Sequence, residues 1–273
     1  MILLSLLLGW ALERAQMVIS APNYNSLFNG YGVMELVNRR EAKAPMAYRV
    51  LVPWLVLAIE RAFKTAPKTR VMIYEALKGL LAACAIYAVW RAWSLPVALC
   101  SCVLWLLTFK FDYWDWAAEV AGIAFAMSGS FPLALFGAVL HGLSRETALL
   151  VPVAFYFAGG SPIQTLIVAS VTCGVLLGVR LIVGKRPLYC ERWQIKYNLD
   201  LFKGFFKWKP VYFGEVFIAA VISVLALAAC VSLPSGWLIP LALLVAGWSM
   251  AKADETRIFA GCIPWIAALL IGA

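Results

Sequence analysis

The chain has 273 residues, of which 64% are hydrophobic and 14% are charged, and its net charge is +9. Soluble domains carry roughly 45–50% apolar and about 25% charged residues, so this composition excludes an ordinary soluble protein. The basic residues lie between apolar segments. This pattern predicts contact with the lipid bilayer and with phosphate-bearing lipids, and not with nucleic acid.

In chain order, the apolar segments predict about ten helical spans. Several are shorter than the ~20 residues that cross a bilayer unaided. Short or broken helices are tolerated where neighbouring helices cover their ends. The fold class predicted is therefore all-α, a polytopic transmembrane bundle that forms one integral membrane domain over residues 1–273. The predicted spans are 2–20, 71–93, 96–109, 113–128, 131–143, 145–159, 163–183, 213–232, 237–250 and 258–272.

The first polar loop, 21–70, contains an apolar segment of another kind. Residues 48–64 include Pro53 and end in charged side chains, which predicts a helix lying in the membrane interface. The alternative is a true span. If this helix lies in the interface, successive turns fall on alternate sides of the membrane. Nearly all charged residues then lie on one side, which also holds the basic aromatic loop 184–212. The positive-inside rule would place that face in the cytoplasm.

Three acids open the span 113–128. Asp112, Asp115 and Glu119 are spaced i, i+3 and i+7, so a helix would align them on one face. Acids near lipid are costly unless they face a cavity, a cation or basic partners. One interpretation is a general base or a site for a metal or sugar hydroxyl. The other is helix N-terminal acids stabilised by the helix dipole, with Glu119 paired internally.

A second polar motif, at 141–147, joins two short apolar segments. Arg145 could bind a phosphate with Glu146 orienting it. Alternatively, Ser144 caps the following helix and Glu146 lies in its first turn. His141 is the only histidine of the chain, which excludes a metal site built from several histidines.

Two further sites carry charge. In the interfacial segment, Tyr48 and Arg49 provide a hydroxyl and a cation for an anion, or serve as an interface anchor. Glu255 and Arg257, in the turn before the last span, would close a cavity or form a solvated turn.

Four segments carry a resemblance to a known family: AYRVLVPWL, FDYWD, SRETALLVP and DETR, in this order after an N-terminal span and a polar loop. This layout resembles small bacterial members of the GT-C superfamily of membrane glycosyltransferases, which are distantly similar to the protein O-mannosyltransferases and the catalytic subunit of oligosaccharyltransferase. The resemblance implies a helical bundle with a cavity on its outer face. It also implies a polyprenyl-phosphate-linked sugar donor and an inverting transfer.

The resemblance also implies residue roles. In this family an acid of the first outer loop often acts as base, but residues 21–47 contain no Asp. Asp112 and Asp115 match a second acid position of the family, so either is the expected base, with Glu35 as the rival. The charged face would then be extracytoplasmic, in a bacterial inner membrane, against the positive-inside rule.

We therefore expect a membrane glycosyltransferase that acts on an acceptor the sequence does not identify. No cofactor or metal site is predicted, although a divalent cation is compatible with the acids. The alternatives are a transporter of lipids or small molecules and a non-catalytic membrane scaffold subunit. The expected substrate-binding residues are Tyr48, Arg49, Glu119, His141, Arg145, Glu146, Glu255 and Arg257.

Overall fold

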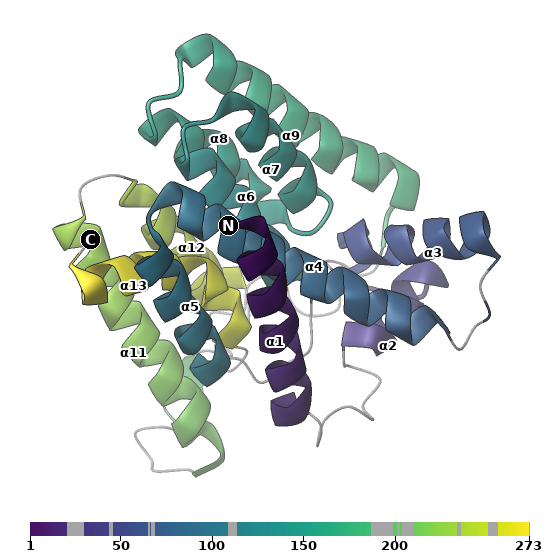
Figure 1. The fold of residues 1–273 in the computed structure, drawn as a ribbon, viewed down its shortest axis with the longest axis horizontal. Coiled ribbons are helices and arrows are strands. Elements are labelled where there is room, and N and C mark those ends of the chain that lie inside the picture. The colour runs from purple at the N-terminus through teal and green to yellow at the C-terminus, as the bar shows by residue number, and fades with distance from the viewer. Residues whose placement is uncertain are drawn as a thin grey trace.

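A computed structural model of the chain describes residues 1–20, 30–43, 46–64, 66, 69–108, 114–186, 199–200, 203, 210–233, 236–250 and 256–272. Every regular element in these ranges is a helix, which confirms the predicted all-α class (Figure 1). The α-helices are α1 (Ile2–Ser20), α2 (Gly30–Asn38), α3 (Leu51–Phe63), α4 (Thr69–Ala92), α5 (Leu95–Thr108), α6 (Asp115–Met127), α7 (Phe131–Gly142), α8 (Leu150–Phe157), α9 (Pro162–Val183), α11 (Pro210–Ser232), α12 (Leu238–Met250) and α13 (Ile263–Ile271). The 3₁₀ helices are η2 (Met46–Tyr48), η3 (Glu146–Leu149) and η4 (Thr256–Cys262).

Two of the predicted apolar segments are broken. The segment 145–159 divides into η3 and α8, and the segment 258–272 divides into η4 and α13. Pro152 and Pro264 lie in the first turns of α8 and α13. Proline has no N–H to donate to the preceding turn, so a new helix begins there instead of the old one continuing.

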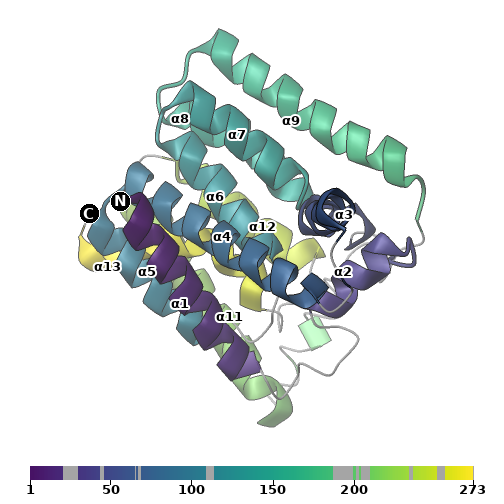
Figure 2. The same ribbon diagram turned by 45° about the vertical axis from the view of Figure 1, so that its right-hand side comes forward.

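The segment predicted to lie in the interface forms a separate helix, α3, preceded by η2. With 13 residues, α3 is too short to cross a bilayer. It packs against α2 and the beginning of α4. Figure 2 shows α2 and α3 together at one end of the bundle, with both chain termini at the opposite end.

Helix α6 is the centre of the bundle, and it packs against α4, α7, α8 and η4. All its residues from Asp115 to Ala126 are buried. Its sequence is rich in alanine and contains Gly122, and such small side chains let neighbouring helices approach closely. The charged residues at its beginning are therefore held in the interior of the molecule.

Over the part of the chain that the structure describes, two helices, α4 and α9, are long and apolar enough to cross a membrane. Most of α9 is exposed on the outside of the bundle, and its exposed side chains include Leu166, Leu177 and Leu181. Such a surface is favourable in lipid and unfavourable in water, which supports association with a membrane. Six other apolar helical stretches, counted over the residues whose side chains the structure describes, have 10–17 residues. The ten-span count remains a prediction.

Candidate functional site

Four charged side chains meet at the beginning of α6. Arg145 donates through Nε to Oδ2 of Asp115 at 2.9 Å and through Nη1 to Oε2 of Glu119. Arg49 donates through Nη1 to the same Oδ2 of Asp115. We call Arg49, Asp115, Glu119 and Arg145 the carboxylate–arginine cluster. It joins three of the polar motifs singled out from the sequence.

Close packing of α6 and α7 sets the position of the cluster. A Cβ added to Gly137 on α7 would lie 2.7 Å from the carbonyl oxygen of Gly122 on α6, so the two backbones touch. The chain then leaves α7 in a turn in which Arg145 N–H donates to the His141 carbonyl at 2.8 Å. This turn directs Arg145 back toward α6.

A pair of backbone hydrogen bonds brings Arg49 to the cluster. The N–H groups of Val50 and Leu51 both donate to the Leu143 carbonyl, at 2.9 and 3.0 Å. They attach the beginning of α3 to the end of α7. The Ser144 hydroxyl donates to the Leu140 carbonyl at 3.1 Å, and the residue before η3 is Arg145. The alternative in which Ser144 caps the next helix is therefore wrong.

The cluster is buried, and its formal charges balance. Asp115 and Glu119 are fully buried, and Arg145 is 7% exposed. Moving charges out of water is costly, and pairing recovers that cost only with good geometry. Removing one partner of such a pair typically costs about 3–5 kcal/mol. The cluster therefore fixes the relative positions of its members more than it adds net stability.

The other predicted binding residues near the cluster are His141, Tyr48 and Glu146. His141 is fully buried, and its Nε2 lies 2.9 Å from the Thr147 hydroxyl oxygen. The Tyr48 ring lies 5.5 Å from the Arg180 guanidinium, and its hydroxyl donates to the Gly184 carbonyl at 3.3 Å. Tyr48, Glu146, Arg145 and Arg180 line a cavity of about 10 Å³. That space holds roughly one water molecule.

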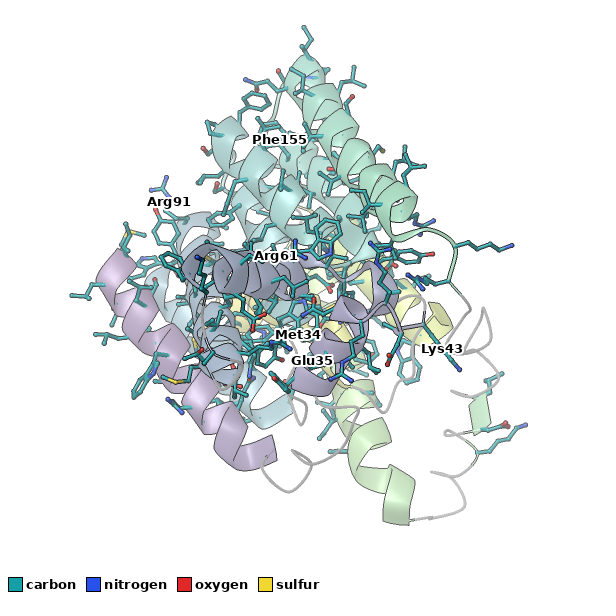
Figure 3. The ribbon with its side chains drawn as sticks, turned by 90° about the vertical axis from the view of Figure 1, so that its right-hand side faces the viewer. Met34, Glu35, Lys43, Arg61, Arg91 and Phe155 are labelled. Carbon is teal, nitrogen blue, oxygen red and sulfur yellow. The ribbon has the colours of Figure 1, made fainter. Side chains whose placement is uncertain are left out.

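Glu35, the rival base, has different partners. On α2, the Glu35 carboxylate (labelled in Figure 3) accepts from Arg70 Nη1 at 2.9 and 3.0 Å. Arg70 also donates through Nε to Glu60. Burial and the nearby Glu35 carboxylate raise the pKa of the Tyr31 hydroxyl. The structure thus pairs Glu35 with a basic side chain of α4 and not with either arginine of the cluster.

Three predicted positions cannot be placed. Asp112 and Glu255 lie outside the described residues, and so does the side chain of Arg257 in η4. Most of the loop 184–212 also lies outside them. Within the described ranges, no three His, Cys, Asp or Glu side chains come together as metal ligands would.

Sequence reasoning missed a second buried ion pair and one basic side chain. Lys78 on α4 lies 3.0 Å from Glu13 on α1 and 3.4 Å from Glu75. Arg180 lies over Tyr48. Charged residues within long apolar segments were the available signal, because such residues are usually paired in the interior.

The chain matches no protein-family model, no curated protein and no solved structure. Its function must therefore be argued from the geometry of the cluster and its surroundings.

Proposed function

We propose that this chain is a membrane glycosyltransferase of the GT-C kind, which moves a sugar from a polyprenyl-phosphate-linked donor to an acceptor. The observation that carries the proposal is the carboxylate–arginine cluster. Arg49 lies 66 residues from Asp115 in the sequence, and Arg145 lies 30 residues from it. The three residues come from three of the four segments that carry the resemblance, and they meet at one buried site.

In the proposed reaction, the acceptor hydroxyl attacks the anomeric carbon of the donor sugar. The bond between that carbon and the phosphate oxygen breaks, and the phosphate leaves with the bonding electrons. A carboxylate takes the proton of the attacking hydroxyl. Arginine stabilises the departing phosphate, because its planar guanidinium offers paired donors to phosphate oxygens.

The hydrogen bonds of Asp115 and Glu119 support a positioning role for both. Asp115 receives hydrogen bonds from both arginines at one oxygen, which suits it to positioning them. Glu119 holds the other end of the Arg145 guanidinium. Asp112 stands three residues before Asp115 in the sequence. We therefore propose Asp112 as the base and Asp115 and Glu119 as positioning residues.

The proposed location is a bacterial inner membrane, with the cluster toward its extracytoplasmic face. Carrier phosphates on that face would account for the basic character of the surrounding segments. A divalent cation is not required by this scheme, and adding a chelator to the assay below would establish whether activity depends on one.

The test uses the purified chain in liposomes, with a radiolabelled sugar on polyprenyl phosphate as donor and a membrane extract as acceptor. We expect label to move to an acceptor while polyprenyl phosphate is released. Movement of unchanged donor across the bilayer would instead identify a transporter. If the chain neither transfers nor transports the donor but assembles with partner proteins, it is a scaffold, and the proposal fails.

A further inference from the structure

A second polar site lies between the ends of α2, α3 and α9. It is a groove of about 340 Å³. One face of α3 lines it, since Val50, Trp54 and Arg61 recur at helical spacing. The other walls include Asn38 at the end of α2, Arg40 just after it, and Arg186 after α9. Among the described residues that line this basic groove, three are arginines and none is acidic.

Several polar atoms of the basic groove are sheltered from water and have no protein partner. Both amide atoms of Asn38, and Nε of Arg186, are buried and make no hydrogen bond to any residue that the structure describes. Buried polar groups are nearly always hydrogen-bonded, so buried groups without a hydrogen-bond partner indicate a ligand site. Two of these atoms are N–H donors, which matches an oxygen-rich anion.

The backbone of Arg40 adds an independent observation. Its φ is +59°, a left-handed conformation that favours glycine and costs free energy in other residues. Its carbonyl accepts from Arg186 Nη1 at 2.8 Å, which joins the end of α2 to the segment after α9. Arginine therefore occupies a position where glycine would be less strained.

We infer that the basic groove binds the phosphate group of a membrane lipid. Three guanidinium groups and the Asn38 amide provide donors for phosphate oxygens. The apolar remainder of the walls, Val50 and Trp54 among them, suits the lipid portion. At the end of α9, the lining residue Ile182 is 65% exposed, and its neighbour Leu181 is 83% exposed. A ligand with a phosphate and an apolar tail matches both parts of the groove.

The inference is independent of the proposed transferase activity, because it concerns binding without turnover. The basic groove is nevertheless close to the carboxylate–arginine cluster in the chain. Val50 lines the groove, and the adjacent Arg49 pairs with Asp115. If the transferase proposal also holds, the carrier phosphate is one candidate occupant.

The test measures binding to the full chain in neutral detergent by titration calorimetry. The probes are dihexanoyl phosphatidic acid, inorganic phosphate and dihexanoyl glycerol, which separate a lipid phosphate from free phosphate and from lipid alone. We expect saturable binding of phosphatidic acid, at least about tenfold tighter than inorganic phosphate, and none of dihexanoyl glycerol. Equal affinity for inorganic phosphate would overturn the lipid assignment, and equal affinity for dihexanoyl glycerol would overturn the phosphate assignment.

Arg40→Gly is the diagnostic variant, because it removes the guanidinium while relieving the left-handed backbone. The matched control is Lys64→Gly, which removes an exposed cation at φ +48° outside the groove. We expect Arg40→Gly, and separately Arg61→Gln, to weaken phosphatidic acid binding about tenfold or more, with Lys64→Gly unchanged. Wild-type affinity in both groove variants, or an equal loss in Lys64→Gly, would contradict a specific site.

Discussion

Arg145, the residue before η3, donates to Glu119 of α6, and both side chains are almost wholly buried. Replacing Arg145 with Met removes the cation and leaves the buried carboxylates of Glu119 and Asp115 without it. We expect the free energy of unfolding to fall by about 3–5 kcal/mol, as for other broken buried pairs. Denaturant titration in mixed micelles measures this loss.

The control for this prediction is Arg61→Met, because Arg61 is exposed on α3. Its effect should stay within about 0.5 kcal/mol. Adding Glu119→Gln to Arg145→Met should recover part of the free energy of unfolding, because the buried Glu119 charge that lost its partner is then removed. A double variant as unstable as the sum of its parts would show that the two residues do not interact.

The contact between Gly122 and Gly137 predicts that added volume at this point separates α6 from α7. Gly137→Ala would place a methyl group 2.7 Å from the Gly122 carbonyl oxygen. We expect it to destabilise the protein by about 1–3 kcal/mol. Gly174→Ala on α9 is the matched control, since no heavy atom lies within 4 Å of the added Cβ. Equal stability of the two variants, compared in the same titration, would contradict the close α6–α7 contact.

The ion pair between Lys78 and Glu13 should hold α1 against α4. Both residues are buried, and they lie on helices that also touch where Gly9 meets Ala83. Lys78→Met should destabilise the protein by about 3–5 kcal/mol, and Lys78→Met with Glu13→Leu should be more stable than Lys78→Met alone. Thermal unfolding of the purified variants in detergent provides the comparison. If Lys78→Met unfolds at the wild-type temperature, the pair does not contribute.

Most of the helices were predictable from the sequence because the apolar segments are separated by polar or proline-containing turns, whereas α2, in the first polar loop, was not predicted. Asp115, Glu119 and Arg145 could be singled out because charges at or within apolar segments are costly without partners. Their pairing was not predictable. It depends on the Gly122–Gly137 contact and on the Leu143 carbonyl that receives α3, which are tertiary features without a local sequence signal.

The Ser144 cap is wrong and the pairing of Glu35 was not predicted, and both outcomes have specific causes. The Ser144 hydroxyl bonds backward to Leu140, since the chain enters η3 through an extended Arg145 and not through a serine cap. Glu35 is engaged by Arg70 because α2 packs near the beginning of α4, a proximity that follows from the fold of residues 30–70. Local spacing alone carries no information on either point.

Membrane crossing predicts that Lys43 and Arg91 lie on opposite sides of the bilayer. Figure 3 shows the two side chains at opposite sides of the molecule, and both are exposed. With the native cysteines replaced, Lys43→Cys and Arg91→Cys should react with an impermeant maleimide from opposite sides of sealed vesicles. Lys64→Cys should be labelled from the Lys43 side. Labelling of Lys43→Cys and Arg91→Cys from one side would contradict the alternating spans.

The most direct test of the proposed function is the rate of sugar transfer by Asp112→Asn, compared with wild type at equal amounts of folded protein. Asp200→Asn is the control, because Asp200 is an exposed aspartate paired only loosely with Lys203 at 3.5 Å. Loss of a general base should slow transfer by about 10²–10⁴-fold in Asp112→Asn and leave Asp200→Asn at the wild-type rate. Asp115→Asn should also transfer more slowly, because the two arginines lose their shared anchor. Full transfer by both Asp112→Asn and Asp115→Asn would contradict the proposed mechanism.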